Sequence, residues 1–139
     1  MPELRAHHVG VTVADLDRAV DFYRTVLDLS LLDRFTVDGE AFATGVGVDG
    51  ASADFAHLDA GGVRIELVAY DPEGDAVHSD AVNRPGTAHL GFAVEDVDAV
   101  YESLPEAVET VSAPQTTASG TRILFLRDPE GNLVELLEA

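Results

Sequence analysis

The sequence contains no cysteine and no lysine, and its eight basic side chains are all arginine. Without cysteine, the chain has no disulfide, no thiolate metal ligand and no cysteine nucleophile. No apolar run approaches the roughly 20 residues that a membrane-spanning helix needs. The first residues show no basic region followed by an apolar stretch, so no signal peptide is predicted. We therefore expect a cytoplasmic protein that makes no use of a membrane.

Positive charge is scarce relative to negative charge. Twenty-six acidic residues oppose eight arginines, and the formal net charge is −18 at pH 7. Such a surface repels phosphate backbones, so nucleic acid is not an expected partner. A lysine-free acidic surface instead favours a halophilic origin, where dissolved salt screens the repulsion. An apolar fraction of 46% in 139 residues predicts one folded domain with a hydrophobic core.

The chain contains an internal repeat. HVGVTVADLD at residues 8–17 and HLGFAVEDVD at residues 89–98 share five of their ten positions. A second pair of matching segments follows, GVRIELV at 62–68 and GNLVELL at 131–137. Each half thus begins with a histidine and ends with a glutamate. We infer a duplicated module, with copies at about 5–70 and 88–138 and a polar linker at about 71–87.

Periodicity predicts the same order of elements in both modules. Apolar alternation and helical spacing indicate a strand, an amphipathic helix and further strands in each. The expected strands are 8–13, 62–70, 88–94, 121–127 and 132–138, with helices at 16–27 and from 97 to Pro105, an N-cap at Asp15, a turn at Asp128–Gly131, and loosely defined strands within 31–58. The predicted fold is α+β, built from two tandem βαβββ modules whose mixed sheet is cupped around a central cavity.

Strand alternation places the repeated histidines and glutamates on one kind of face. His8 alternates with Val9, and Glu66 alternates with Ile65, so both leave the apolar face that a helix would cover. His89 and Glu135 do the same in module 2. Two glutamates that converge would repel each other, and a divalent cation removes that cost. Two imidazoles and two carboxylates suit Ni, Co, Mn, Fe or Zn.

A six-coordinate ion with these four ligands keeps two adjacent positions open. That arrangement fits a small substrate with two neighbouring oxygens, whose enolate the ion would stabilise as a Lewis acid. A glutamate in the shell could move a proton at carbon. A closed four-coordinate zinc site without catalysis is the structural alternative. His7, His57 and His78 lie outside the repeat, the last two in expected loops, and are interpreted as surface or packing histidines.

Two arginines are candidates for anchoring an anionic substrate. Arg64 shares the face of Glu66, and Arg122 is expected to point into the cavity. In so acidic a chain, pairing with a surface carboxylate is the alternative for each of them.

Segments 8–23, 85–92 and 128–135 resemble the vicinal oxygen chelate superfamily, which includes glyoxalase I, methylmalonyl-CoA epimerase, extradiol dioxygenases and bleomycin-resistance proteins. The resemblance implies paired βαβββ modules whose first and last strands carry the metal ligands. By position these are His8, Glu66, His89 and Glu135.

A glutamate at position 66 is typical of glyoxalase I-like members, whereas the epimerases tend to have glutamine there. The resemblance therefore implies a metal-dependent lyase or isomerase in which Glu66 and Glu135 shuttle a proton. An acyl-CoA epimerase and a non-catalytic small-molecule binding or resistance protein are the alternatives. A homodimer is expected, and the site could form within one chain or across two.

The excess of acidic side chains predicts that stability depends on salt. In dilute buffer the carboxylates repel one another, whereas at about 1 M salt the screening length falls to about 3 Å. We expect the melting temperature, followed by circular dichroism, to rise steadily as KCl is added. Equal melting temperatures in dilute buffer and in molar KCl would contradict the halophilic interpretation.

Overall fold

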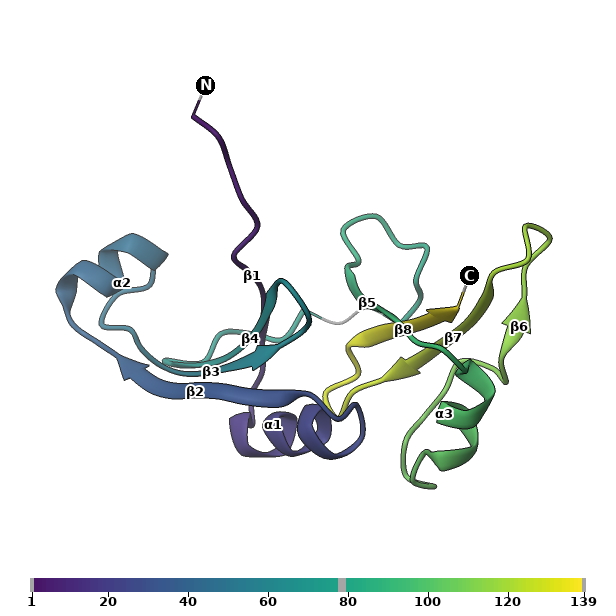
Figure 1. Ribbon diagram of the computed structural model, residues 1–139. Helices are drawn as coiled ribbons and strands as arrows, with labels where there is room; N and C mark the ends of the chain where they lie inside the picture. The colour runs from purple at the N-terminus through teal and green to yellow at the C-terminus, as the bar shows by residue number, and fades with distance from the viewer. Residues whose placement is uncertain (1, 78–79, 139) are drawn as a thin grey trace. The chain divides into compact units, whose positions relative to one another are not determined.

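The computed structural model describes residues 2–77 and 80–138, so His78 lies outside the described residues. The chain divides into two compact units, Met1–Ala76 and Val77–Ala139, and each unit contains a four-stranded mixed sheet (Figure 1). The boundary falls inside the segment predicted as a linker. The predicted α+β class and the tandem arrangement of two similar modules are confirmed.

Unit 1 pairs its first strand with its last. Its elements are β1 (His8–Thr12), α1 (Leu16–Thr25), β2 (Ser30–Val37), α2 (Glu40–Val46), β3 (Ser52–Asp59) and β4 (Arg64–Asp71). The strand order across the sheet is β1-β4-β3-β2. β1 runs parallel to β4, while β2, β3 and β4 form an antiparallel meander.

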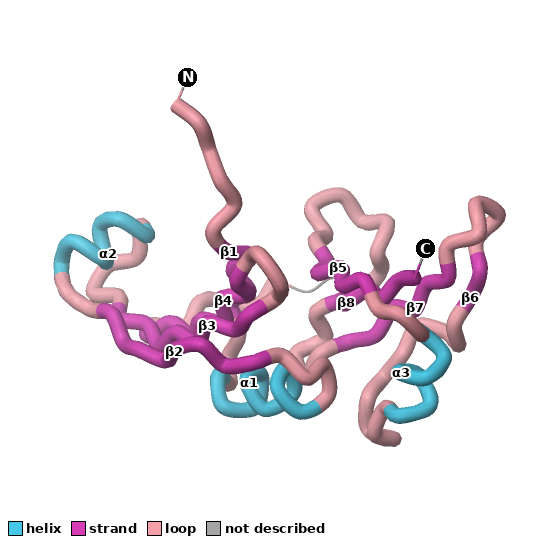
Figure 2. Tube along the Cα trace, viewed as in Figure 1, coloured by secondary structure: helices cyan, strands magenta, loops and turns pink. Residues whose placement is uncertain are grey.

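The described part of unit 2 repeats this strand plan without a counterpart of α2, and its helix and last three strands are shorter than those of unit 1 (Figure 2). Its elements are β5 (His89–Ala93), α3 (Val97–Ser103), β6 (Gln115–Thr116), β7 (Arg122–Arg127) and β8 (Leu133–Glu138), with the sheet order β5-β8-β7-β6. β5 is parallel to β8, as β1 is to β4. The two modules therefore share topology as well as sequence.

Each main helix begins at an aspartate of the repeat. The side chain of Asp15 accepts a hydrogen bond from the backbone N–H of Arg18 at 3.0 Å, which confirms the predicted cap. Asp96 accepts the equivalent bond from Ala99, also at 3.0 Å. These bonds satisfy amide groups that the helix cannot pair internally. The cap therefore fixes where each helix leaves its first strand.

The core of each unit lies between its helix and one face of its sheet. In unit 1, α1 contacts β3 and β4, and buried residues include Val20, Tyr23, Leu58 and Leu67. Val13 is buried, but Val9, which was expected on the same core face, is 45% exposed. Because α1 packs on β3 and β4, it leaves that end of β1 uncovered.

Among the described residues, no helix has the length and apolarity needed to cross a bilayer.

Residues 31–58 contain a helix that the sequence analysis did not predict. α2 lies between β2 and β3, where only strands with polar breaks were expected. Its sequence signal is weak because it is one to two turns long and includes Gly45, a poor helix former. Gly39 before it and Gly47 at its C-cap adopt φ values of 100° and 73°, which favour glycine. Phe42 anchors the helix against Phe55 and Tyr70.

Candidate metal centre

Parallel strand pairing brings the repeated histidine and glutamate of each unit together. In unit 1, Gly10 is the register partner of Glu66, and His8 lies two residues before it on the same face. The distance from His8 Nε2 to Glu66 Oε1 is 3.6 Å. In unit 2, Gly91 is opposite Glu135, and His89 Nε2 lies 3.3 Å from Glu135 Oε1.

These separations fit a shared metal ion. Two ligand atoms each about 2.1 Å from one ion lie about 3.0–3.4 Å apart at ordinary coordination angles. The observed distances of 3.6 Å and 3.3 Å are close to that range. The donors are an imidazole nitrogen and a carboxylate oxygen in both units, which is the chemistry that first-row divalent ions prefer.

A glycine keeps the space beside each carboxylate open. A Cβ atom at Gly10 would lie 3.8 Å from Glu66 Oε1, and one at Gly91 would lie 4.0 Å from Glu135 Oε1. Neither glycine has a positive φ, so conformational freedom does not explain the residue type. A Cβ at either position would therefore make an ordinary contact with the carboxylate, and a longer side chain would take up more of the space beside it. The same open space recurs in both copies, which supports a ligand at this place.

The structure assigns His57 a different position from the one predicted. It lies in β3 rather than in a loop, is opposite Glu66 in the sheet register, and is only 6% exposed. Its Nε2 lies 2.7 Å from Glu66 Oε2. The expected loop position of His57 is therefore wrong, and of the two expected roles, surface or packing, its burial fits packing. The alternation of Phe55 and His57 was the available signal, but β3 was too loosely defined in the sequence to use it.

His7 also belongs to this cluster, although it is exposed as expected. Its Nδ1 lies 2.8 Å from Nδ1 of His8, and the two rings meet edge to face with centroids 5.1 Å apart. This contact uses the ring nitrogen of His8 that faces away from Glu66. It leaves Nε2 of His8 directed to the carboxylate, as a metal ligand requires.

The corresponding positions in unit 2 carry apolar residues. Phe125 is opposite Glu135 in the sheet register, where His57 is opposite Glu66. The ring of Phe125 lies 5.1 Å from the ring of His89. Leu133 precedes Glu135 by two residues, where Arg64 precedes Glu66. The two histidine–glutamate pairs therefore have the same donors in different surroundings.

An aromatic cluster lies on the same face of the unit 1 sheet as Glu66. Phe35 and Phe55 are directly paired in the register and stack at 5.1 Å, and Phe35 meets the His57 ring edge-on at 5.2 Å. Phe42 of α2 stacks on Tyr70 at 6.2 Å. Four of the nine aromatic residues of the chain thus gather beside the histidine cluster, although the chain as a whole has few.

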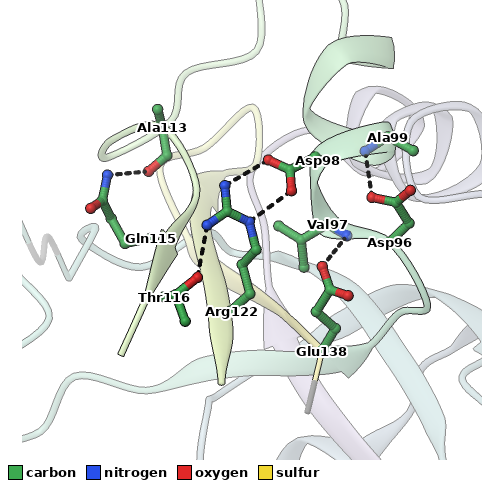
Figure 3. A network of polar contacts seen from close by, with 9 residues as sticks. All are labelled: Asp96, Val97, Asp98, Ala99, Ala113, Gln115, Thr116, Arg122 and Glu138. Atoms are coloured by element: carbon green, nitrogen blue, oxygen red, sulfur yellow. Dashed lines mark hydrogen bonds and ion pairs between the residues drawn. The ribbon is translucent and has the colours of Figure 1, made fainter. Parts of the chain in front are cut away.

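Arg122 lies on the helix-covered face of the unit 2 sheet. It is register partner to Glu138, and alternation places it opposite in facing to Phe125 and Glu135. Its guanidinium forms two 2.7 Å bonds to Asp98 of α3 and a 2.9 Å bond to Thr116 (Figure 3). Arg122 therefore pairs with an acidic side chain, which was the alternative to substrate binding considered for it. This pairing directs the side chain away from the face that carries Glu135, so the structure does not support Arg122 as a substrate anchor.

Among the described residues, three carboxylates in unit 2 lie close enough together to hold a cation. They are Asp96, Asp98 and Glu138. Each already has a structural partner: Asp96 caps α3, Asp98 binds Arg122, and Glu138 accepts the backbone N–H of Val97 at 3.0 Å (Figure 3). The cluster therefore fastens α3 to its sheet. None of the four predicted ligands belongs to it.

Two open surface pockets in unit 1 also lie away from the predicted ligands. One, of about 470 Å³, is lined by α2 and the following loop, including Glu40, Thr44 and Asp49. The other, of about 670 Å³, lies between α1 and β2. Neither contains His8, His57 or Glu66, so the candidate metal centre rests on donor chemistry rather than on the depth of a pocket.

Comparison with known proteins identifies the family. The family described as Glyoxalase/Bleomycin resistance protein/Dioxygenase superfamily matches residues 5–136. The chain therefore belongs to this superfamily.

Named relatives include two kinds of enzyme. The chain is 32% identical to a 2-epi-5-epi-valiolone epimerase from an Actinomyces species, over 94% of this chain and 77% of the relative. It is 26% identical to a probable lactoylglutathione lyase from Vibrio cholerae, over 99% and 93% of the two chains. A glyoxalase family protein from Bacillus cereus has a similar structure, with a TM-score of 0.88, 29% identity and coverage of 99% and 95%.

The glycine beside Glu66 predicts a size limit for substitution. Gly10→Ala should keep metal binding, because a Cβ 3.8 Å from Oε1 is an ordinary contact. Gly10→Leu should abolish it, because the longer side chain covers the carboxylate. Gly45→Leu, in the open surroundings of α2, is the matched control and should bind metal like the wild type. Metal content after dialysis measures all three, and a metal-loaded Gly10→Leu protein would contradict the prediction.

The Arg122–Asp98 pair predicts a pH-dependent contribution to stability. The hydrogen bonds from Arg122 hold the pKa of Asp98 below its usual range. The pair therefore stabilises the fold above the ordinary carboxyl pKa and ceases to do so as pH falls through the lower folded pKa. Arg122→Leu should lower the melting temperature at pH 7, and the difference from wild type should shrink in strong acid. A difference that stays constant with pH would show that the pair does not contribute in this way.

Proposed function

We propose that this protein is a divalent-metal-dependent lyase or isomerase of the glyoxalase I-like type. His8, Glu66, His89 and Glu135 would together hold one ion, with the two pairs contributed by one chain or by two copies in a homodimer. The observation that supports this most directly is the recurrence, in both units, of an imidazole nitrogen beside a carboxylate oxygen next to a glycine that leaves room for a ligand.

The charges of these side chains suit a divalent ion. Two carboxylates carry −2 in total, which balances a +2 ion, and the two histidines bind it as neutral imidazoles. When bound, such an ion acts as a Lewis acid toward neighbouring oxygens of a substrate and lowers the cost of forming an enolate. Glu66 and Glu135 are both partly buried, which limits competition from water for their oxygens.

The glutamates are the groups that would move a proton. One carboxylate can accept a proton from the carbon beside the substrate carbonyl and return it to a neighbouring carbon, or the other carboxylate can donate a proton to the opposite face. Return to a neighbouring carbon gives an isomerised product, as a lactoylglutathione lyase would need. Donation to the opposite face gives an epimer. The names of the two relatives correspond to these two outcomes, so the shared step is the part of the proposal that both support.

The aromatic cluster beside Glu66 supports a second candidate function. Phe55 is buried against Phe42 and Tyr70, whereas Phe35 is exposed and could contact an apolar small molecule bound without chemistry, as in a resistance protein. The histidine–glutamate pairs favour the enzyme, because an apolar binding surface has no need of two repeated carboxylates.

The proposed function predicts that metal binding requires all four side chains. Protein grown in metal-replete medium should contain a divalent ion by mass spectrometry, and Glu66→Gln and Glu135→Gln should lose most of it. Glu73→Gln makes the same chemical change at an exposed position and should retain the metal. Metal-free wild-type protein, or full metal content in both ligand variants, would contradict the proposal.

The type of reaction can be identified by following the C–H bond next to the carbonyl of the substrate. The metal-loaded wild type should exchange deuterium from solvent into the carbon next to the carbonyl, and Glu135→Gln should not. Formation of a lactoylthioester from methylglyoxal and a thiol would indicate the lyase. Inversion at C2 of a 2-substituted acyl thioester would indicate the epimerase. Tight binding of an apolar small molecule to metal-free protein, without exchange, would favour the binding protein.

A further inference from the structure

Glu66 is held by a chain of hydrogen bonds that has no counterpart at Glu135 among the described residues. Arg64 Nη1 lies 3.2 Å from His57 Nδ1, and His57 Nε2 lies 2.7 Å from Glu66 Oε2. All three residues face the same side of the unit 1 sheet, on the adjacent strands β3 and β4. In the described part of unit 2, Phe125 and Leu133 occupy the corresponding positions and provide no such donor.

The guanidinium determines the direction of every bond in this chain. Arginine carries only N–H donors, so Nδ1 of His57 must accept from Arg64. The ring proton of the neutral imidazole is then on Nε2, and Nε2 donates it to Glu66 Oε2. A flipped ring or the other tautomer would break both bonds. Arg64 thus orients His57, and His57 orients the carboxylate.

The surroundings of His57 restrict its movement. The side chain is buried, and the ring of Phe35 packs edge-on against it at 5.2 Å. A buried imidazole with both nitrogens hydrogen-bonded stays in one rotamer, because any other rotamer would leave two buried polar atoms without partners. Glu66 Oε2 is therefore occupied. Oε1 is the oxygen that faces His8 Nε2 and the open space beside Gly10.

We propose that Arg64 and His57 are positioning residues that fix Glu66 as a one-oxygen metal ligand through Oε1. This rests on the proposed metal site, and it makes the two glutamates inequivalent. Glu66 is restrained by a donor on its second oxygen, while within its own unit Glu135 has His89 as its partner and an apolar ring where His57 would be. Histidine, not phenylalanine, is therefore required at position 57.

Cobalt binding to the full chain tests this role without relying on activity. Metal-free wild type, His57→Phe and His57→Gln are titrated with Co²⁺, and the dissociation constant and the visible d–d spectrum are recorded. His57→Phe copies unit 2 and should weaken binding about 10–100-fold and alter the spectrum. In His57→Gln the amide nitrogen is placed near the lost Nε2 and can donate to Glu66. It should restore most of the affinity and the wild-type spectrum.

Leu58→Val is the matched control. It trims a buried side chain next to His57 on the opposite, helix-covered face of β3, and it should lower the melting temperature while leaving the Co²⁺ affinity and spectrum unchanged. Wild-type binding by His57→Phe, or equally weak binding by His57→Gln and His57→Phe, would overturn the positioning role. If His57→Phe fails to fold by circular dichroism, Arg64→Leu takes its place. It removes the exposed first donor, and it should weaken binding and shift the spectrum; wild-type behaviour would overturn the role.

The glutamate variants separate this inference from the proposed function. If Glu66→Gln and Glu135→Gln bind Co²⁺ like the wild type, or the wild type binds none, the metal site is wrong and the positioning role fails with it. If those variants lose Co²⁺ while His57→Phe keeps it, the metal site stands and only the role of His57 and Arg64 is wrong.

Discussion

Parallel pairing between the first and last strands of each unit is the constraint on which the candidate site depends. Directly paired residues share a face of a sheet, so placing Gly10 opposite Glu66 brings His8 beside the same carboxylate. The pairing of Gly91 with Glu135 does this again in unit 2. A shift of one residue in either register would send the glutamate to the helix-covered face. The crossing helix, capped by Asp15 or Asp96, permits parallel pairing in both units.

The repeat made the main features of the fold predictable, because identical residues recur where the topology repeats. Five strands, both main helices and the Asp15 cap follow from alternation and helical spacing. The facing of His8, Glu66, His89 and Glu135 away from the helix follows from the same parity, whereas the contact of each histidine with a glutamate of its own unit depends on strand register. α2 and His57 were not predicted, since both lie in residues 31–58, where glycine, alanine and aspartate interrupt the periodicity. Arg122 was misplaced because both faces of β7 carry apolar residues, so alternation does not tell which face the helix covers.

The two units differ most at positions outside the repeated sequence segments. The histidine, glutamate and glycine are present in both, whereas the residue opposite the glutamate on the neighbouring antiparallel strand is His57 in unit 1 and Phe125 in unit 2. The scarce positive charge is also used locally: Arg34 pairs with Asp17, Arg84 with Asp80 and Arg122 with Asp98. Arg64 is distinct because it bonds to an imidazole. The chain has only eight arginines and a net charge of −18. One of these arginines, Arg64, reaches Glu66 through the neutral ring of His57 rather than by a direct ion pair.

Gly10 and Gly91 carry a consequence for protein engineering. Both lie inside strands, where glycine weakens a sheet and β-branched residues strengthen it. Neither position requires a left-handed backbone. A thermostabilisation campaign guided by strand propensity would therefore choose valine or isoleucine at both. If a ligand occupies the space beside each carboxylate, the variants with the most stable sheets would be those that can no longer bind it.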